Sequence, residues 1–300
     1  MTKYLCKYIS TIDLPQDADF DSALALAKEE NENNLKDWWG ECFVNFTAVK
    51  VKDGSLKVDD LNAKLLEEGC NTACFVESDD INKEVFIYLL KTLPQDRFYD
   101  SEDEYDSRYK LIYKLEHSDF FYAPATIKGH CNFEGGLLLH SLNVYFNLLN
   151  ILAIKDNFRT EEWDAFKICG LLHDISRMNY YEKSVKNVKV YSKTGSKQDE
   201  LGKFDWEAQK SYKTRDVNDR FIYGGLEQNS LFMIRTFLRL SIYEEVAILH
   251  ALGQENQERD GSDNTQVIFS KYPLASMLHT ADMLACYLDE FDFEVSDSNE

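Results

Sequence analysis

Hydrophobic residues between positions 107 and 292 recur every three or four residues in several separate runs, as expected for helices with one buried face. Five such runs each predict a helix, at residues 135–153, 160–175, 230–240, 241–253 and 273–291. The chain has only 4 prolines, and proline interrupts helices because it lacks a backbone donor. The pattern therefore predicts a mainly α fold, built around a helical bundle over residues 107–292.

Residues 1–95 alternate between helical and strand-like patterns. The spacing predicts two helices and one short strand, at residues 21–39, 81–93 and 72–77 respectively. Residues 42–60 predict a β-hairpin, because two β-rich runs flank the polar turn Lys52-Asp53-Gly54-Ser55. This region is therefore expected to be a small α/β domain of unknown role that precedes the helical domain.

Two acidic segments and one long polar insertion interrupt these patterns. Pro94 ends the preceding helix, the acidic residues 96–106 predict a linker, and residues 293–300 predict an acidic tail. Residues 180–224 are too long for a connector in a compact domain, so we expect them to be functional or partly mobile. Their cations and aromatic rings suit the phosphates and base of a nucleotide; a solvated lid is the alternative. The predicted substrate-binding residues are Lys183, Lys186, Lys189, Arg215 and Trp206.

The formal net charge of −20 repels polyphosphate backbones at long range, so composition argues against nucleic acid as the main partner. A local site can still bind a small anion. The 7 cysteines are scattered and odd in number, as is typical of reduced thiols in a cytosolic protein. No apolar run has the length of a signal peptide or of a membrane span. The sequence therefore predicts a soluble, cytoplasmic protein without a membrane partner, and leaves the oligomeric state open.

All 6 histidines lie in the second region, and His140, His173, His250 and His279 each interrupt a separate apolar run. A single histidine on an apolar helix is usually a hydrogen-bonded core residue, but four of them suggest one shared reason. The adjacent His173 and Asp174 are also costly to bury without partners. Imidazole and carboxylate groups directed into a helical bundle suit Mn²⁺, Fe²⁺, Co²⁺, Ni²⁺ or Zn²⁺. The pattern therefore predicts a metal centre.

The order of these residues resembles the HD-domain superfamily of metal-dependent phosphohydrolases: His140, then His173-Asp174, then Asp282 in "LHTADMLACYLDE". The flanking sequence extends the likeness, because "GGLLLHSLNVY" is similar to the "GGLLEHSLNVY" motif of a bacterial and phage branch. The resemblance covers about residues 105–290. It implies an HD-type helical domain in which His140, His173, Asp174 and Asp282 bind one metal ion.

The family pattern also implies where a second ion binds. His250 matches a second-metal ligand of some members, and Asp174 is the natural bridge between two ions. A further histidine of the family's "GHGEKS"-like segment is missing, since "YGGLEQNS" places Leu226 and Glu227 there. Two protein ligands hold an ion weakly, so we expect one tightly bound ion. Glu227 is the alternative ligand, and its carboxylate favours Mg²⁺ or Mn²⁺.

The resemblance implies hydrolysis of a phosphoester or phosphoanhydride, with a nucleotide or another small phosphorylated molecule as substrate. A metal ion acidifies water and polarises a phosphoryl oxygen, and the predicted catalytic residues beside it are Asp174, Arg177 and His130. Arg177 neutralises charge on the phosphoryl oxygens, and His130 meets a phosphate or acts as an acid. Two alternatives stay open: a 3′→5′ exonuclease, and a catalytically degenerate protein that binds a nucleotide or a partner.

Overall fold

The computed structural model describes residues 4–41, 45–52, 56–100, 106–153, 162–252 and 264–290. About 50% of the chain is helical and 17% lies in strands, which form one parallel and one antiparallel three-stranded sheet. The fold is therefore mixed α/β, and the predicted mainly α class with a helical bundle is wrong. The predicted turn residues 53–55 and the acidic tail 293–300 lie outside the described residues.

The parallel sheet is built from alternating strands and helices. These are β1 (Ile9–Asp13), α1 (Phe20–Glu41), β2 (Phe46–Lys50), α2 (Val58–Glu67), β3 (Ala73–Val76) and α3 (Ile81–Lys91). The strand order is β1-β2-β3, and both pairings are parallel. The predicted helices at α1 and α3 and the predicted strand at β3 are confirmed.

The predicted hairpin at residues 42–60 is wrong. β2 pairs with β1 and β3, and the residues that follow it form α2, which buries Leu61 and Leu65. The first four residues of β2 are all buried, because a central parallel strand is covered on both faces. Such a strand gives a continuous apolar run, which does not reveal whether its partner is parallel or antiparallel.

Helices account for most of the remaining described chain. They are η1 (Gln95–Arg97), α4 (Ser107–Glu116), α5 (Gly136–Ala153), α6 (Glu162–Leu172), η2 (Ile175–Arg177), η3 (Val217–Asp219), α7 (Leu226–Arg235), α8 (Ile242–Leu249), α9 (Asn264–Lys271), α10 (Pro273–Leu284) and the π-helical turn η4 (Ala285–Asp289). The five predicted runs correspond to α5, α6, α7, α8 and α10, with shifted ends. α6 ends at Leu172, so His173 and Asp174 lie in the turn before η2. None of the described helices combines the length and the apolar character needed to cross a membrane.

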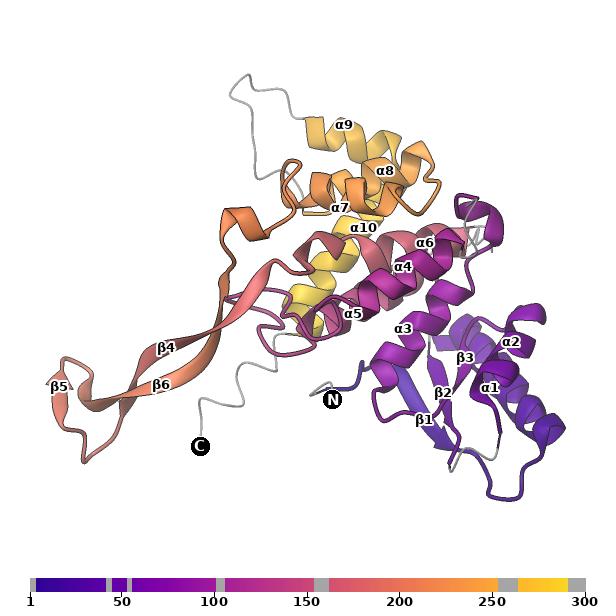
Figure 1. The fold of residues 1–300 in the computed structure, drawn as a ribbon, viewed down its shortest axis with the longest axis horizontal. Helices are drawn as coiled ribbons and strands as arrows, with labels where there is room; N and C mark the ends of the chain where they lie inside the picture. The colour runs from indigo at the N-terminus through magenta and orange to yellow at the C-terminus, as the bar shows by residue number, and fades with distance from the viewer. Residues whose placement is uncertain are drawn as a thin grey trace.

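The parallel sheet and the helices share one hydrophobic core. α3 contacts both β3 and α5 and joins the two parts of the molecule (Figure 1). The ring of Phe46 in β2 packs against Tyr88 of α3 and Phe146 of α5, at centroid distances of 6.3 and 6.2 Å. The beginning of the predicted linker also lies against the helices, because Phe98 forms a β-bridge with Leu238. Residues 101–105 of that linker lie outside the described residues.

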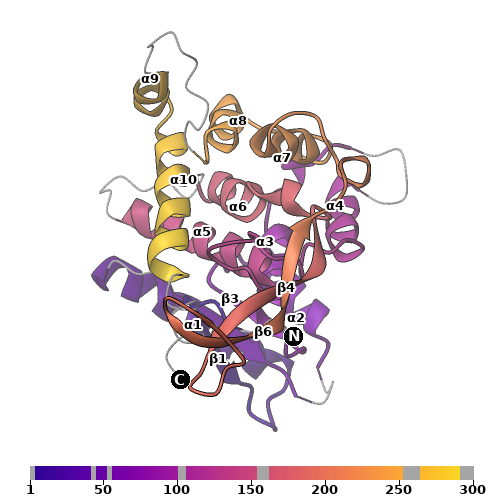
Figure 2. The ribbon, with the colours of Figure 1, turned by 90° about the vertical axis from the view of Figure 1, so that its left-hand side faces the viewer.

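The polar insertion forms an antiparallel arm of three strands: β4 (Tyr181–Tyr191), β5 (Lys197–Asp199) and β6 (Gly202–Thr214), in the order β4-β6-β5. Figure 1 shows the arm projecting away from the helices, and in Figure 2, turned by 90°, it points toward the viewer. Because most of its side chains meet solvent on both faces, the arm has no apolar stripe of period two. That stripe is the signal by which a strand is usually predicted, so the sequence pattern did not reveal this sheet.

Lys167 on α6 is a buried cation, 2% exposed, whose ammonium lies 3.8 Å from an oxygen of Asp164. Burial lowers the pKa of Lys167 from 10.5 to about 8. The unfolded chain therefore holds this proton more tightly than the folded chain. The free energy of unfolding consequently rises with pH between about 8 and 10.5. Below about pH 8 Lys167 is charged in both states, and the full cost of burying its charge destabilises the folded chain.

We expect Lys167→Met to raise the free energy of unfolding at pH 7, by an upper limit of roughly 3 kcal/mol set by the pKa difference. Urea unfolding of both proteins at pH 7 and pH 10 measures this effect. The advantage of the variant should shrink at pH 10, where the native lysine loses its charge. Lys213→Met, at an exposed lysine of the arm, is the control and should change little. An advantage that is the same at both pH values would contradict a penalty from buried charge.

Candidate metal centre

Three segments bring the four predicted ligands of the first metal together. His140 lies on α5, His173 and Asp174 occupy the turn after α6, and Asp282 lies on α10. α5 contacts both α6 and α10, so the three segments converge inside the core. The four side chains are buried, with exposed fractions between 1% and 6%.

The ligand atoms of this cluster face one another. Nε2 of His140 lies 3.1 Å from Oδ1 of Asp282 and 3.8 Å from Oδ2 of Asp174. Nε2 of His173 lies 3.8 Å from the same Asp174 oxygen and 3.9 Å from the same Asp282 oxygen. His140, His173 and Asp174 each offer a ligand atom within 4.8 Å of the other two. This cluster can therefore hold a metal ion.

The hydrogen bonds of the two histidines leave their Nε2 atoms available. Nδ1 of His173 lies 3.0 Å from the carbonyl oxygen of Gly170, and Nδ1 of His140 lies 3.1 Å from Oε1 of Glu290. Both partners are acceptors, so each Nδ1 carries a proton, and each ring in its neutral, metal-binding form presents a lone pair at Nε2. Both Nε2 atoms are buried, and neither has a hydrogen-bond partner among the described residues. Protein groups commonly orient metal-binding histidines in this way.

The charges around the cluster also favour a cation. Asp174, Asp282 and Glu290 are buried carboxylates, and Arg177 is a buried cation in contact with Asp174. With neutral histidines these four side chains carry a net charge of about −2, which matches a divalent ion. Burial lowers the pKa of His140, but Glu290 and Asp282 outweigh burial and raise it well above its ordinary value. The group therefore attracts positive charge even onto a buried imidazole.

Arg177, which the sequence predicts to meet the substrate, is bound to a ligand of the cluster instead. Its Nε donates to Oδ2 of Asp174 at 2.6 Å, and NH1 donates to the hydroxyl of Tyr181 at 2.9 Å. Burial raises the pKa of Asp174, but Arg177 and the histidines outweigh it, so the pKa lies below its ordinary value. Arg177 thus holds Asp174 ionised and in position, and Tyr181 connects this pair to the first residue of β4.

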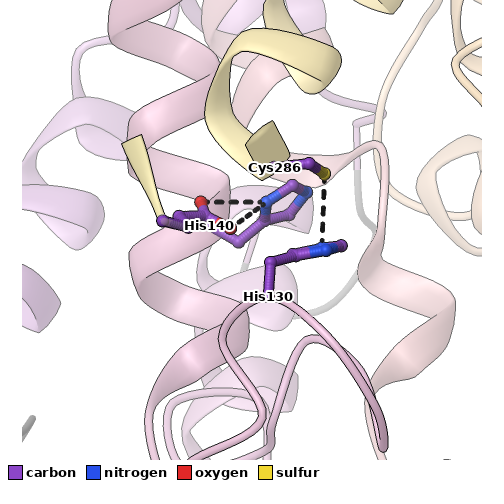
Figure 3. Close-up of side chains that lie close together, drawn as sticks. His130, His140 and Cys286 are labelled. Carbon is purple, nitrogen blue, oxygen red and sulfur yellow. Dashed lines mark hydrogen bonds and ion pairs between the residues drawn. The ribbon is translucent and has the colours of Figure 1, made fainter. Parts of the chain in front are cut away.

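His130, the other predicted catalytic residue, lies beside the cluster next to Cys286 (Figure 3). The ring centroids of His130 and His140 are 5.0 Å apart, and Nε2 of His130 lies 3.4 Å from Sγ of Cys286. Burial and the neighbouring His140 lower the pKa of His130 to about 4, whereas burial raises the pKa of the Cys286 thiol. The Cys286 thiol also lies 3.6 Å from Oδ1 of Asp282 as a donor, and a neutral His130 ring can accept a proton. The predicted role of His130 as an acid stays a prediction.

Two side chains that the sequence analysis missed complete the surroundings of His140. Cys286 and Glu290 follow Asp282 by four and eight residues, across the π-helical turn η4. They form a second group of ligand atoms within 4.8 Å of one another, together with His130 and His140. The i, i+4, i+8 spacing after Asp282 is a signal that could have found them.

The predicted ligands of a second metal are not part of these groups. His250 is the residue at the end of α8, and Glu227 lies in the first turn of α7. Burial lowers the pKa of His250, and the charge of Glu227 opposes this effect, so the two residues influence each other. Neither belongs to the groups of close metal-ligand atoms found in the described part of the chain. Nδ1 of His279 donates to the carbonyl oxygen of Ala251 at 2.8 Å, which suits a core histidine.

The predicted substrate-binding residues lie along the arm and at its base rather than around the cluster. Lys183 pairs with Glu134 at 2.9 Å, and Lys189 pairs with Asp199 at 2.6 Å. Arg215 donates to the carbonyl of Tyr181 at 2.8 Å and pairs with Asp119 at 3.1 Å. The two remaining predicted residues, Lys186 and Trp206, are exposed.

The sequence was compared with protein families, curated proteins and solved structures. No family model, curated protein or solved structure matches it. The geometry of the cluster and the chemistry of its residues therefore carry the functional argument.

Gly170 sets the distance between α6 and α5. A Cβ atom at this position would lie 2.6 Å from Cα of Tyr145, so α6 crosses the backbone of α5 without room for a methyl group. We expect Gly170→Ala to destabilise the protein by about 1–3 kcal/mol, because overpacking outweighs the usual gain in helix propensity. The variant should also bind less metal, because His173 is anchored to the Gly170 carbonyl.

Thermal unfolding and metal analysis of purified Gly170→Ala measure both effects. The control is Ala165→Gly at a half-buried position of the same helix. This change should cost about 1 kcal/mol through helix propensity alone and leave the metal content unchanged. If Gly170→Ala were as stable as the native chain and bound as much metal, α5 and α6 could move apart to accommodate the methyl group without cost.

Proposed function

We propose that His140, His173, Asp174 and Asp282 bind one divalent cation and that the chain hydrolyses a phosphoester or phosphoanhydride, as members of the HD-domain superfamily do. The observation that carries the proposal is the pair of buried Nε2 lone pairs facing two carboxylates, with no hydrogen-bond partner for either nitrogen among the described residues. Leaving such atoms buried and unpaired is costly, and a bound cation removes the cost.

The donor set of two imidazoles and two carboxylates suits Mn²⁺, Fe²⁺, Co²⁺, Ni²⁺ or Zn²⁺. A cation held there supplies Lewis-acid chemistry for the cleavage of a phosphorus–oxygen bond. Arg177 keeps Asp174 ionised and oriented, and Glu290 holds the Nδ1 proton of His140. His130 is a neutral acceptor beside the cluster, suited to receive a proton. We propose one tightly held ion, since Glu227 and His250 lie outside the groups of close ligand atoms.

The test combines metal analysis with an activity screen on the purified full chain. Substrates are a p-nitrophenyl phosphodiester, nucleotides and cyclic nucleotides, each with Mn²⁺, Co²⁺, Ni²⁺, Zn²⁺ or Mg²⁺. We expect about one ion per chain and metal-dependent hydrolysis. His173→Asn is the inactive variant, because the asparagine amide can still donate to the Gly170 carbonyl while the ligand nitrogen is lost. Equal activity of this variant would trace the signal to a contaminant. Metal binding without hydrolysis of any substrate would favour the binding-protein alternative.

A further inference from the structure

The arm differs in charge from the rest of the molecule. Residues 181–214 contain eight lysines and five acidic residues, a charge of +3, while the whole chain carries −20. The remainder of the chain therefore carries −23. All eight lysines are exposed. An anionic polymer that the body of the protein repels is thus attracted at the arm, so the net charge of the chain does not exclude such a partner.

The register of β4 and β6 separates the side chains of the arm into two faces, because directly paired residues of an antiparallel ladder point to the same side. One face, here called the cationic–aromatic face, consists of the pairs Lys183–Tyr212, Val185–Lys210, Asn187–Ala208, Lys189–Trp206 and Tyr191–Phe204. These ten residues include no acid. The opposite face carries Glu182, Asp205 and Glu207 beside its lysines. All aromatic rings of the ladder and three of its five lysines therefore lie on the cationic–aromatic side, away from these acids.

Several apolar side chains of the cationic–aromatic face are exposed. Trp206 is 48% exposed, Tyr191 43% and Val185 65%. The ammonium of Lys189 lies 4.5 Å from the ring centroid of Phe204 and 5.8 Å from that of Trp206. Lys189 and Tyr191 also bind Asp199 of β5 at the outer end of the arm. Exposed ion pairs of this kind are weak, so a phosphate can replace the carboxylate.

The inner end of this face reaches the metal cluster. A cavity of about 300 Å³ opens at the base of the arm, lined by Lys183, Val185, Lys210 and Tyr212 and by Glu134 from the loop before α5. Tyr181 precedes Lys183 by two residues and therefore points to the same side of β4. Its hydroxyl accepts from Arg177, which holds Asp174. Two hydrogen bonds thus connect the inner end of the face, through the buried Tyr181 and Arg177, to Asp174 of the cluster.

We propose that the cationic–aromatic face binds single-stranded nucleic acid and leads it toward the metal cluster. The substrate of the proposed hydrolysis is then a polynucleotide, which is cleaved at a phosphodiester bond. Lysines contact phosphates, and exposed rings stack on bases, which are available only when unpaired. A duplex would use the lysines but leave the rings unused. The inference rests on the proposed function for its catalytic part, whereas its binding part stands on the arm alone.

Fluorescence anisotropy of labelled 15-nucleotide oligo(dT), oligo(U) and a 15-base-pair duplex, with the full chain in EDTA, tests the binding. We expect DNA or RNA single strands to bind more tightly than the duplex, with affinity falling as salt rises. Trp206→Ala and the double variant Lys183→Gln/Lys210→Gln should each weaken binding by at least about 10-fold. The matched control, Lys186→Gln/Lys203→Gln on the opposite face, removes the same charge and should stay within about 3-fold.

Melting temperatures of all variants check that the fold is kept. No binding of any oligonucleotide at low salt, tighter binding of the duplex, or equal losses in both double variants would overturn the inference.

Hydrolysis separates the two proposals. The arm variants should cleave a p-nitrophenyl phosphodiester at the native rate but lose cleavage of oligonucleotides. Native-like oligonucleotide cleavage by Trp206→Ala and by Lys183→Gln/Lys210→Gln would overturn the guiding role. Binding with the expected face dependence but no hydrolysis of any phosphoester or phosphoanhydride would refute the proposed function and leave the binding surface in place.

Discussion

Asp282→Asn should remove the divalent cation from the purified protein and lower the rate of phosphodiester hydrolysis by more than about 100-fold. Mutating a residue that only orients a metal ligand costs up to about 100-fold in affinity or activity, and losing a ligand itself should cost more. Asp282 is 6% exposed, and its Oδ1 lies 3.1 Å from Nε2 of His140 and 3.9 Å from Nε2 of His173. Asparagine keeps the size and removes the negative charge. Metal analysis after dialysis and rates with added cation measure the two losses.

The control for this variant is Asp164→Asn, which changes a partly buried aspartate of α6 that pairs with Lys167. It should keep the metal and the activity. A second readout does not depend on turnover. A cation at 100 times its dissociation constant stabilises the native chain by about 2.7 kcal/mol, and it should leave the melting temperature of Asp282→Asn unchanged. If the cation stabilised Asp282→Asn as much as the native chain, the ion would bind elsewhere.

The helices that carry the ligands could be predicted from the sequence because each has one apolar face that the core must cover. The histidines stand out against that background, which is why His140, His173 and Asp282 were found together. The turn at His173-Asp174 was mistaken for helix for the same reason. Its neighbours Leu171, Leu172 and Ile175 are all buried, so hydrophobicity continues after the backbone leaves the helix.

The pairing of the parallel sheet and the whole of the arm escaped prediction, for opposite reasons. β2 is buried over its first four residues, so its sequence predicts a strand but not whether its partners are parallel or antiparallel. The arm is largely exposed on both faces, and each face mixes polar with apolar residues. Only the observed register of β4 with β6 shows that one face combines all of the ladder's aromatic rings with three of its five lysines and no acid. The role of Arg177 was likewise hidden, because its distance from Asp174 depends on the turn η2 that follows α6.

Glu290 provides the second large effect. Its carboxylate is fully buried and accepts from Nδ1 of His140 at 3.1 Å and from the amide of Asn143 at 3.0 Å. The negative charge makes the His140 ring a stronger donor at Nε2 and fixes which nitrogen carries the proton. Glu290→Gln keeps the shape and an acceptor oxygen but removes the charge. We therefore expect metal affinity to fall by about 10–100-fold.

Asp289→Asn is the matched control, because Asp289 is the preceding residue of the same turn and its side chain is also buried. Its carboxylate binds Lys7, Tyr8 and Asn147, none of which is a ligand of the cluster. Chelator competition with Co²⁺ or Zn²⁺ measures the affinity of each protein. Since both variants lose one buried negative charge, a general electrostatic effect would weaken them alike. A loss confined to Glu290→Gln would show that the charge acts through the His140 ring, and native affinity in that variant would contradict this role.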